Sequence, residues 1–241
     1  MEKTTWYGPS TCDFCGRNCQ KTLYDGKTKS GTWATMCRTC FIENGMGLGY
    51  GVGQKYTLNP ETQKYELDTA TYNSKDEPKA KGLNFNIDFP TDWESKESDS
   101  SKVVRHFEKT EFNGIELKAA DVFIMVEKYS DSKTAALEYS DYFSKEGTKA
   151  RFEQQGHSII LIQKIKISNL DSWLVESRIS QKNVPFPMFT RLLKTEFAYK
   201  NYVITIQASA TGDSLSNSET LFKEVKSTFL EMINSFTILD E

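Results

Sequence analysis

Four cysteines near the start of the chain have the type and spacing of a metal site. Cys12 and Cys15 lie in the run TCDFCGR, and Cys37 and Cys40 lie in TMCRTCF, with 21 residues between the two pairs. Two Cys-x-x-Cys pairs at such a separation are typical of four-cysteine zinc sites. Two tight turns brought together surround one ion with four thiolates at about 2.3 Å. We therefore expect one zinc ion, and a structural one, because sulfur would fill every coordination position.

Other uses of these cysteines stay open at this point. Two disulfides, a redox dithiol or an iron site of the rubredoxin type could all employ the same residues. The N-terminal run MEKTTWYGPS has no apolar core of a signal peptide, so we expect a cytoplasmic protein, in which disulfides are rare. The fifth cysteine, Cys19, lies too near Cys15 to replace a ligand easily and is expected to be a free thiol.

The remaining sequence offers little for catalysis. Its two histidines, His106 and His157, fall in or beside expected strands. Glu108 and Glu111 are expected to be solvated surface residues. The sequence contains no serine-hydrolase elbow, no zinc-protease motif and no dinucleotide fingerprint. We expect no catalytic residues, no bound organic cofactor and no enzymatic activity.

A small domain must position the cysteines. Residues 1–66 cannot bury enough apolar surface without a metal, so the ion is expected to organise the segment. Glycines alternate with apolar residues over 45–53, which predicts a strand with one bare face. The aromatic residues expected to pack around the ion as a miniature core are Trp6, Tyr7, Phe14, Tyr24, Trp33 and Phe41.

The distribution of charge along the chain gives little support for binding to nucleic acid. Residues 1–66 hold eight Lys and Arg against six Asp and Glu, a balance of +2, and the whole chain carries −3, which leaves −5 for the rest. Nucleic-acid binders usually show a clustered basic surface. Lys27 and Lys29 lie in the YDGKTKSG turn, where two lysines are more often solvated. Nucleic-acid binding through the cysteine segment is therefore an alternative to protein binding.

The order CDFCGR, DGKTKSGTWATMC, RTC and GLGYGVGQKY resembles small zinc-ribbon-like proteins of bacteria and phages whose function is uncharacterised. The resemblance covers about residues 6–56. It implies metal binding by Cys12, Cys15, Cys37 and Cys40 and implies no particular activity.

A second domain is expected over 83–241, after a polar linker at 67–82. Alternating apolar residues predict strands, and a shift to helical spacing predicts a helix over 132–145. Short turns at 169–171 and 200–201 favour antiparallel hairpins. Ser216 and Glu219 form a capping box for a final helix. The expected strands are 83–90, 103–108, 120–128, 158–168, 172–180, 189–199 and 202–208. Strands in hairpins with segregated helices indicate an α+β fold.

The opening NFNIDFPTDW and the ending FLEMINSFTI resemble PsbP-like domains, a family that includes DcrB-like bacterial proteins. The resemblance covers about residues 80–241 and rests on Phe89-Pro90, Trp93 and Ser235-Phe236. It implies an antiparallel sheet flanked by helices. Members of that family mostly bind other proteins, including effector chaperones of type VI secretion, and no catalytic residue set carries over.

One stretch outside the periodic elements could face a partner. The run NVPFPMF, residues 183–189, has two prolines that exclude a regular central strand, and it holds Phe186, Met188 and Phe189. Rigidly held aromatic and Met side chains suit an interface, although the loop could instead fold back onto the sheet. No run of 18 apolar residues exists, so no membrane span is expected. The sequence predicts a cytoplasmic, non-enzymatic adaptor or chaperone-like protein with a structural zinc ion.

Overall fold

The structure is a computed structural model that describes residues 5–46, 53–112, 117–129, 141–181 and 188–239. Two compact units are present. The first combines the described residues up to Asn73 with Asn86–Thr91 and Glu231–Leu239, and the second combines Ser74–Phe85 with the described residues of Asp92–Leu230.

The described residues of the first unit contain one short helix, α1 (Arg38–Asn44), and two sheets. The four-stranded sheet has the order β2-β1-β3-β4 and is formed by β1 (Thr22–Lys27), β2 (Trp33–Met36), β3 (Gly53–Asn59) and β4 (Lys64–Leu67). The three-stranded sheet has the order β14-β6-β5 and is formed by β5 (Thr69–Asn73), β6 (Phe85–Pro90) and β14 (Thr237–Ile238).

The stretch 67–82, expected to be a linker, holds regular structure. Strand β5 pairs antiparallel with β6, from Thr69 opposite Pro90 to Asn73 opposite Asn86, and the 3-10 turn η1 (Pro78–Ala80) follows. The polar composition that suggested a linker belongs to a short, half-exposed edge strand, which needs an apolar residue at few of its positions. The first boundary between the compact units, after Asn73, falls within this stretch, although Asn86–Thr91 and Glu231–Leu239 also belong to the first unit.

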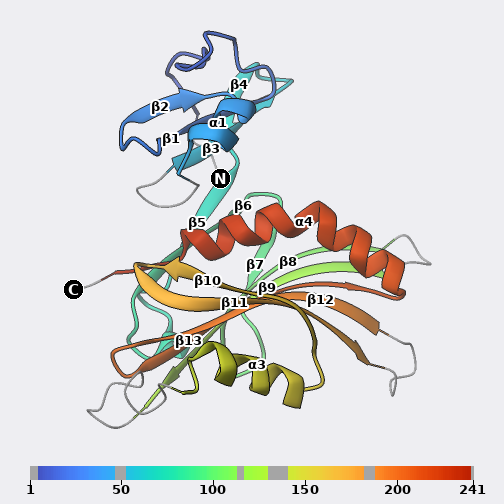
Figure 1. Ribbon diagram of the computed structural model, residues 1–241. Helices are drawn as coiled ribbons and strands as arrows, with labels where there is room; N and C mark the ends of the chain where they lie inside the picture. Colours follow the sequence, from blue (N-terminus) through green and yellow to red (C-terminus); the bar gives the residue numbers. More distant parts are fainter. Residues whose placement is uncertain (1–4, 47–52, 113–116, 130–140, 182–187, 240–241) are drawn as a thin grey trace. The chain divides into compact units, whose positions relative to one another are not determined.

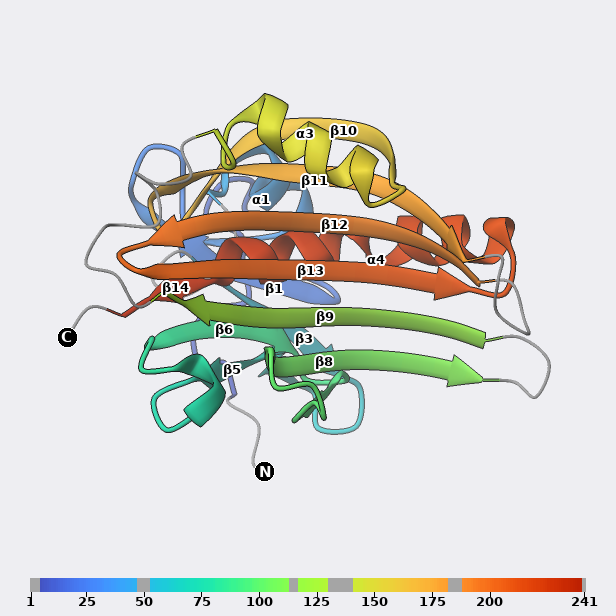
Figure 2. The same ribbon diagram turned by 90° about the horizontal axis from the view of Figure 1, so that it is seen from below.

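The second unit is built on a seven-stranded sheet in the order β10-β11-β12-β13-β9-β8-β7, in which all neighbours pair antiparallel. The strands are β7 (Glu94–Lys96), β8 (Val103–Phe112), β9 (Leu117–Lys128), β10 (Ser158–Ile167), β11 (Leu170–Gln181), β12 (Met188–Tyr199) and β13 (Tyr202–Gly212). Helix α4 (Leu215–Ser235) lies along one face of this sheet and α3 (Lys145–Gln154) lies on the other (Figure 1). Seen from the α3 side, the long strands run side by side across the unit (Figure 2). The predicted α+β class, with a mostly antiparallel sheet, is confirmed.

Alternation explains the central strands. In β9, Val122, Ile124 and Val126 are fully buried and the residues between them face the other side of the sheet. Both expected hairpins are present, with the first turn at Ser168 and Asn169 rather than at 169–171. Ser168 and Asn169 both have positive φ, as a two-residue hairpin with right-handed twist requires, and Lys200 has positive φ at the next one.

The helix expected over 132–145 lies mostly outside the described residues, and its described end differs. Residues 141–144 form a turn, and α3 begins at Lys145 because the Ser144 hydroxyl accepts a hydrogen bond from the Gly147 N–H at 2.9 Å. Gly156, with φ of +80°, follows the helix end.

The capping box expected at Ser216 and Glu219 is wrong by two residues. The hydroxyl of Ser214 accepts from the Asn217 N–H at 3.1 Å, so α4 begins at Leu215. Phe222, Phe229 and Met232, which recur at helical spacing in the sequence, are buried. Glu219 does not cap the helix, and its side chain instead contacts Arg178 and Arg191 on the sheet.

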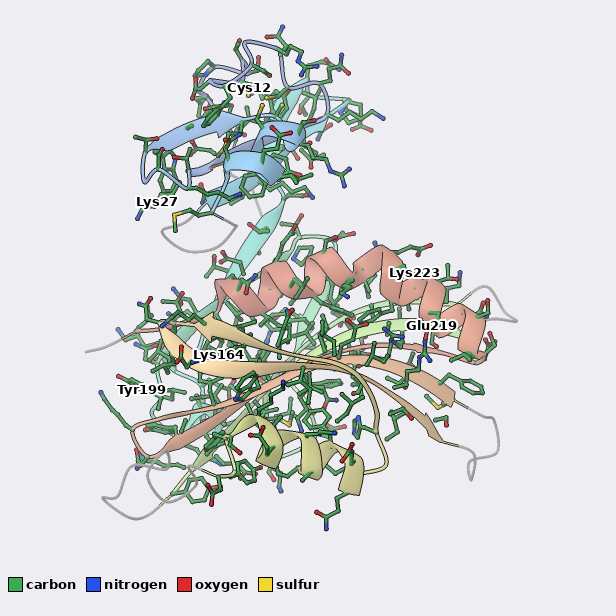
Figure 3. The ribbon with its side chains drawn as sticks, in the orientation of Figure 1. Cys12, Lys27, Lys164, Tyr199, Glu219 and Lys223 are labelled. Atoms are coloured by element: carbon green, nitrogen blue, oxygen red, sulfur yellow. The ribbon has the colours of Figure 1, made fainter. Side chains whose placement is uncertain are left out.

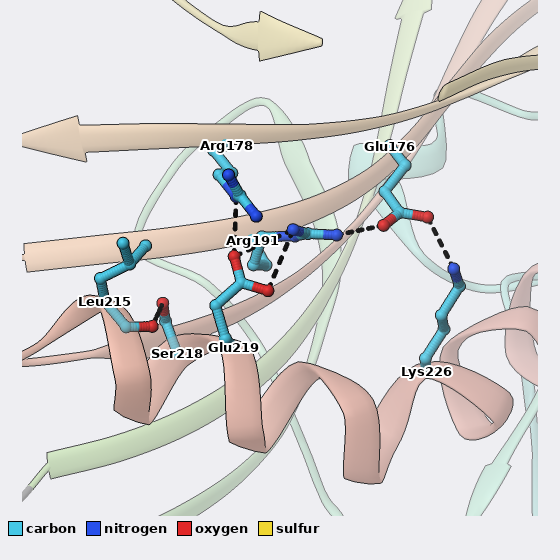
Figure 4. A network of polar contacts seen from close by, with 7 residues as sticks. All are labelled: Glu176, Arg178, Arg191, Leu215, Ser218, Glu219 and Lys226. Carbon is cyan, nitrogen blue, oxygen red and sulfur yellow. Dashed lines mark hydrogen bonds and ion pairs between the residues drawn. The ribbon is translucent and has the colours of Figure 1, made fainter. Parts of the chain in front are cut away.

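A buried network of charged side chains ties α4 to β11 and β12 (Figure 4). Arg191 donates to both oxygens of Glu219, at 2.9 and 3.0 Å, and to Glu176. Glu176 also accepts from Lys226 Nζ at 2.6 Å, and Arg178 donates to Glu219 at 2.7 Å. The side chains of Arg191 and Glu176 are each only 7% exposed. Buried charges of this kind are tolerated only when each has a close partner of opposite sign.

Candidate metal centre

The first cysteine pair lies in a tight loop that closes on itself. Cys12 N–H donates to the Arg17 carbonyl and Gly16 N–H donates to the Cys12 carbonyl, both at 2.9 Å. Gly16 has φ of +68°, a conformation that favours glycine. The Asp13 carboxylate accepts from the Thr35 N–H at 2.7 Å, which holds the loop against β2. The loop therefore presents two sulfurs on one side of a fixed turn.

The second pair is placed by α1. Cys37 is the residue before the helix and Cys40 lies in its first turn, so both side chains point to the same side. The Phe41 N–H donates to the Cys37 carbonyl at 2.9 Å and confirms a regular helical turn there. The start of α1 therefore places two sulfurs close together, as the loop containing Gly16 does for the first pair.

The structure brings the four sulfurs together. The Sγ atoms of Cys12, Cys15, Cys37 and Cys40 all lie within 4.8 Å of one another, and those of Cys15 and Cys37 are 3.9 Å apart. A tetrahedron with metal–sulfur bonds of about 2.3 Å has sulfurs about 3.8 Å apart. Cys12 and Cys40 are buried and the other two are partly exposed. The group could hold a metal ion.

Hydrogen bonds prepare part of the site for thiolates. The backbone N–H of Arg17 and then its guanidinium lower the pKa of Cys15 to about 6. Burial acts to raise the pKa of Cys12, but backbone N–H groups of Cys37, Cys15 and Phe14 outweigh it and lower that pKa. A lowered pKa favours the thiolate, which is the form that binds metal.

Burial and the crowding of other thiols raise the pKa of Cys40. In the absence of a cation, four thiolates would repel one another. The raised pKa therefore favours the protonated Cys40 thiol, and a bound metal ion would displace that proton.

Cys19 is separate from this group. Its side chain is 3% exposed, and burial, followed by the nearby Cys12 and Cys37 sulfurs, raises its pKa to about 11. All five cysteines lie in the described part of the chain and none forms a disulfide. The expectation that Cys19 is a free thiol agrees with this placement.

Of the expected aromatic core, Tyr24 is buried, Trp6 and Phe41 are partly buried, and the other three residues are exposed. Tyr24 stacks on Phe41 with ring centroids 4.4 Å apart, and Trp6 packs against Tyr56 at 5.3 Å. In contrast, Tyr7 is 88% exposed, and Phe14 and Trp33 are each 48% exposed. Leu23 and Met36, which are fully buried, fill the centre of the segment instead.

The two lysines considered for nucleic acid lie away from the sulfurs. Lys27 pairs with Trp33 at the end of the β1–β2 hairpin opposite the cysteines, as Figure 3 shows by the labels of Cys12 and Lys27. Lys29 donates to the Glu43 carbonyl at 2.6 Å. One of the two charges is thus already engaged by the chain itself.

The residues expected to face a partner are placed differently from the prediction. Phe186 lies outside the described residues. Met188 and Phe189 are half-buried and are the first residues of β12, paired with Gln181 and Ser180, rather than part of a loop. Phe189 lines a cavity of about 240 Å³ together with other residues that include Arg178 and Leu215. Contact of Met188 and Phe189 with a partner stays a prediction.

Sequence reasoning missed a second group of metal-ligating residues. His106, placed by the sequence in an expected strand, and Glu108, taken as solvated surface, lie beside Asp121 on the neighbouring strand. His106 and Glu108 lie two residues apart on β8 and share a face, and the register of β8 against β9 brings Asp121 beside them. The alternation of β9 could have indicated which side Asp121 faces, but not its partner.

Comparisons with known proteins identify no family for this chain. No protein-family model matches it, and no curated protein has significant sequence similarity to it. Within the residues that the structure describes, no helix is both long and apolar enough to cross a membrane.

Three solved structures share part of the chain's arrangement. LpqN of Mycobacterium tuberculosis, described as involved in cell envelope biogenesis, is 8% identical with a TM-score of 0.46, over 71% of this chain and 92% of that one. A Bacteroides thetaiotaomicron protein is 15% identical with a TM-score of 0.36, over 65% of this chain and 46% of that one. Protein PA94 of Pseudomonas aeruginosa, described as a protein of unknown function, is 9% identical with a TM-score of 0.38, over 65% of this chain and 91% of that one. At these values the likenesses assign neither family nor function.

Proposed function

We propose that the protein is a non-enzymatic binding protein, an adaptor or chaperone-like module, whose N-terminal segment is a zinc ribbon with one structural zinc ion. Cys12, Cys15, Cys37 and Cys40 hold the ion, and the C-terminal part is a PsbP-like domain of the DcrB-like kind. The observation that carries the proposal is the close approach of four sulfurs within a small segment that leaves several aromatic side chains exposed to solvent.

Zinc suits the donor set. Four thiolates in a closed arrangement leave no coordination position for water or substrate, so the ion stabilises structure and does no chemistry. Iron accepts the same ligands and is the competing metal. The absence of disulfides among the five described cysteines fits a reducing compartment and supports a cytoplasmic location.

Exposed apolar side chains on a rigid support favour binding of another protein. Trp33 is 48% exposed, yet its indole Nε1 donates to Asp25 at 2.7 Å across the β1–β2 hairpin, which fixes the ring. Phe14 lies between two metal-ligating cysteines and is equally exposed. Aromatic side chains ordered before binding lose little entropy in a complex and often act as anchors.

The test compares capture of partners by variants of the zinc-loaded full chain. We expect Trp33→Ser and Phe14→Ser to weaken capture of one identified protein at least about tenfold, which is about 1.4 kcal/mol. Ile160→Ser, which alters an apolar residue 45% exposed on β10, is the matched control and should not change capture.

Equal capture by all three variants would refute a role for the cysteine segment in protein binding. Capture of nucleic acid that weakens with salt and is lost with Lys27→Ala would favour the alternative instead.

A further inference from the structure

Three carboxylates face one another across the edge of the seven-stranded sheet. Glu94 on β7 lies directly opposite Glu108 on β8, and Glu108 lies directly opposite Asp121 on β9. Their neighbours Phe107 and Val122 point to the α4 side, so the carboxylates point to the opposite face. Like charges in direct cross-strand positions are destabilising. Positive charge is therefore needed among them, and Lys96 supplies part of it.

The adjacent row of the sheet supplies an imidazole. His106 Nε2 lies 2.8 Å from Asp121 Oδ1 and 3.7 Å from Glu108 Oε2. The ring stacks on Phe123, with centroids 4.3 Å apart and planes 18° from parallel, so its orientation is fixed. Lys96 Nζ lies 2.5 Å from Glu108 Oε1. The two oxygens of Glu108 therefore have separate roles, one toward the lysine and one toward the imidazole.

The spacing of the three groups suits a cation. One ligand atom from each of His106, Glu108 and Asp121 lies within 4.8 Å of the others. Ligands about 2.1 Å from an ion lie about 3.0 to 3.4 Å from one another, and the two distances of 2.8 and 3.7 Å bracket that range. The three side chains are 13–20% exposed, which leaves a path for an ion to enter.

We infer that His106, Glu108 and Asp121 bind one divalent first-row metal ion such as Mn²⁺ or Zn²⁺. Lys96 holds the second oxygen of Glu108 and orients it, as partners of metal ligands commonly do. Glu94 is exposed beside the group and is available as a further ligand. Rigid adjacent strands supply all of these residues, so binding requires no rearrangement of the backbone.

This site differs in kind from the four cysteines. One imidazole with carboxylates suits Mn²⁺ and Zn²⁺, whereas four thiolates favour zinc or iron over the harder Mn²⁺. The competing explanation is a protonated His106 that neutralises the carboxylates with no ion present. The two explanations differ in one measurable respect, which is whether the folded chain takes up Mn²⁺.

The experiment titrates the zinc-loaded full chain with Mn²⁺ and follows the free ion by its electron paramagnetic resonance signal. We expect one Mn²⁺ bound per chain, with affinity reduced at least about tenfold in Asp121→Asn and in His106→Gln. Asp92→Asn and His157→Gln are matched controls and should bind as the unchanged chain does. His157 contacts Ser177, which is four strand spacings from Glu108, or about 19 Å.

A second measurement guards against variants that fail to fold. In the unchanged chain, Mn²⁺ should broaden the ring resonances of His106 and leave those of the only other histidine, His157, sharp. Broadening of neither histidine, a dissociation constant above about 1 mM, or equal binding by folded Asp121→Asn overturns the inference.

Discussion

Removing the Arg191 side chain should be among the most costly single changes in the second unit. In Arg191→Ala, Glu176 remains buried with Lys226 as its partner at 2.6 Å, and Glu219 keeps Arg178. Breaking a buried ion pair from one side costs about 3–5 kcal/mol. Because Lys226 still pairs with Glu176, we expect the lower end, about 3 kcal/mol, and a fall in melting temperature of roughly 6–12 °C.

The assay is urea unfolding with a double-variant comparison. Replacing both partners, as in Arg191→Met with Glu176→Leu, should cost less than the sum of the single changes, because no charge is left buried alone. Lys164→Ala is the control, since its pair with Asp171 is more than half exposed and its loss should leave the urea midpoint nearly unchanged. Additive losses, or a loss below about 1 kcal/mol for Arg191→Ala, would refute the buried-pair explanation.

The other predictions concern the cysteine loop, pH and the partner. Gly16→Ala should weaken metal retention against a chelator, since φ is +68° there; Gly31→Ala, with φ of +88° and away from the cysteines, should not. Burial, followed by the Lys194 charge, lowers the pKa of His157, so the folded chain holds fewer protons at this site than the unfolded chain below about pH 6.5. The stability that His157 contributes is therefore present above that pH and falls below it, and urea unfolding should show His157→Asn costing less at pH 5.5 than at pH 7.5. Met188→Ser should weaken capture of the partner with little change in melting temperature; a large drop in melting temperature would place Met188 in the core.

Local spacing allowed the sequence to predict the cysteine group and the hairpins. Cys12 with Cys15 and Cys37 with Cys40 are each joined by a single turn, so the sequence nearly determines their geometry. The alternation of apolar residues in β9 and their helical spacing in α4 each lie within one element, so both can be read from the local sequence.

The sequence could not predict contacts between residues that are distant along the chain. The pairing of His106 with Asp121 depends on strand register, and the burial of Arg191 depends on a helix that begins 24 residues later. The exposure of Trp33 was missed because a small segment has too little interior for all its aromatic side chains. β5 was taken for a linker because an edge strand needs few apolar residues.

The metal content of the protein tests the central claim most directly. The full chain, purified without added metal and dialysed against a chelator, should retain one zinc per chain by elemental analysis. Cys12→Ser should lose that zinc together with the folded structure of the cysteine segment, because metal binding supplies most of its folding free energy. A zinc content near zero in the unchanged chain, with the four cysteines joined in disulfides, would contradict the account.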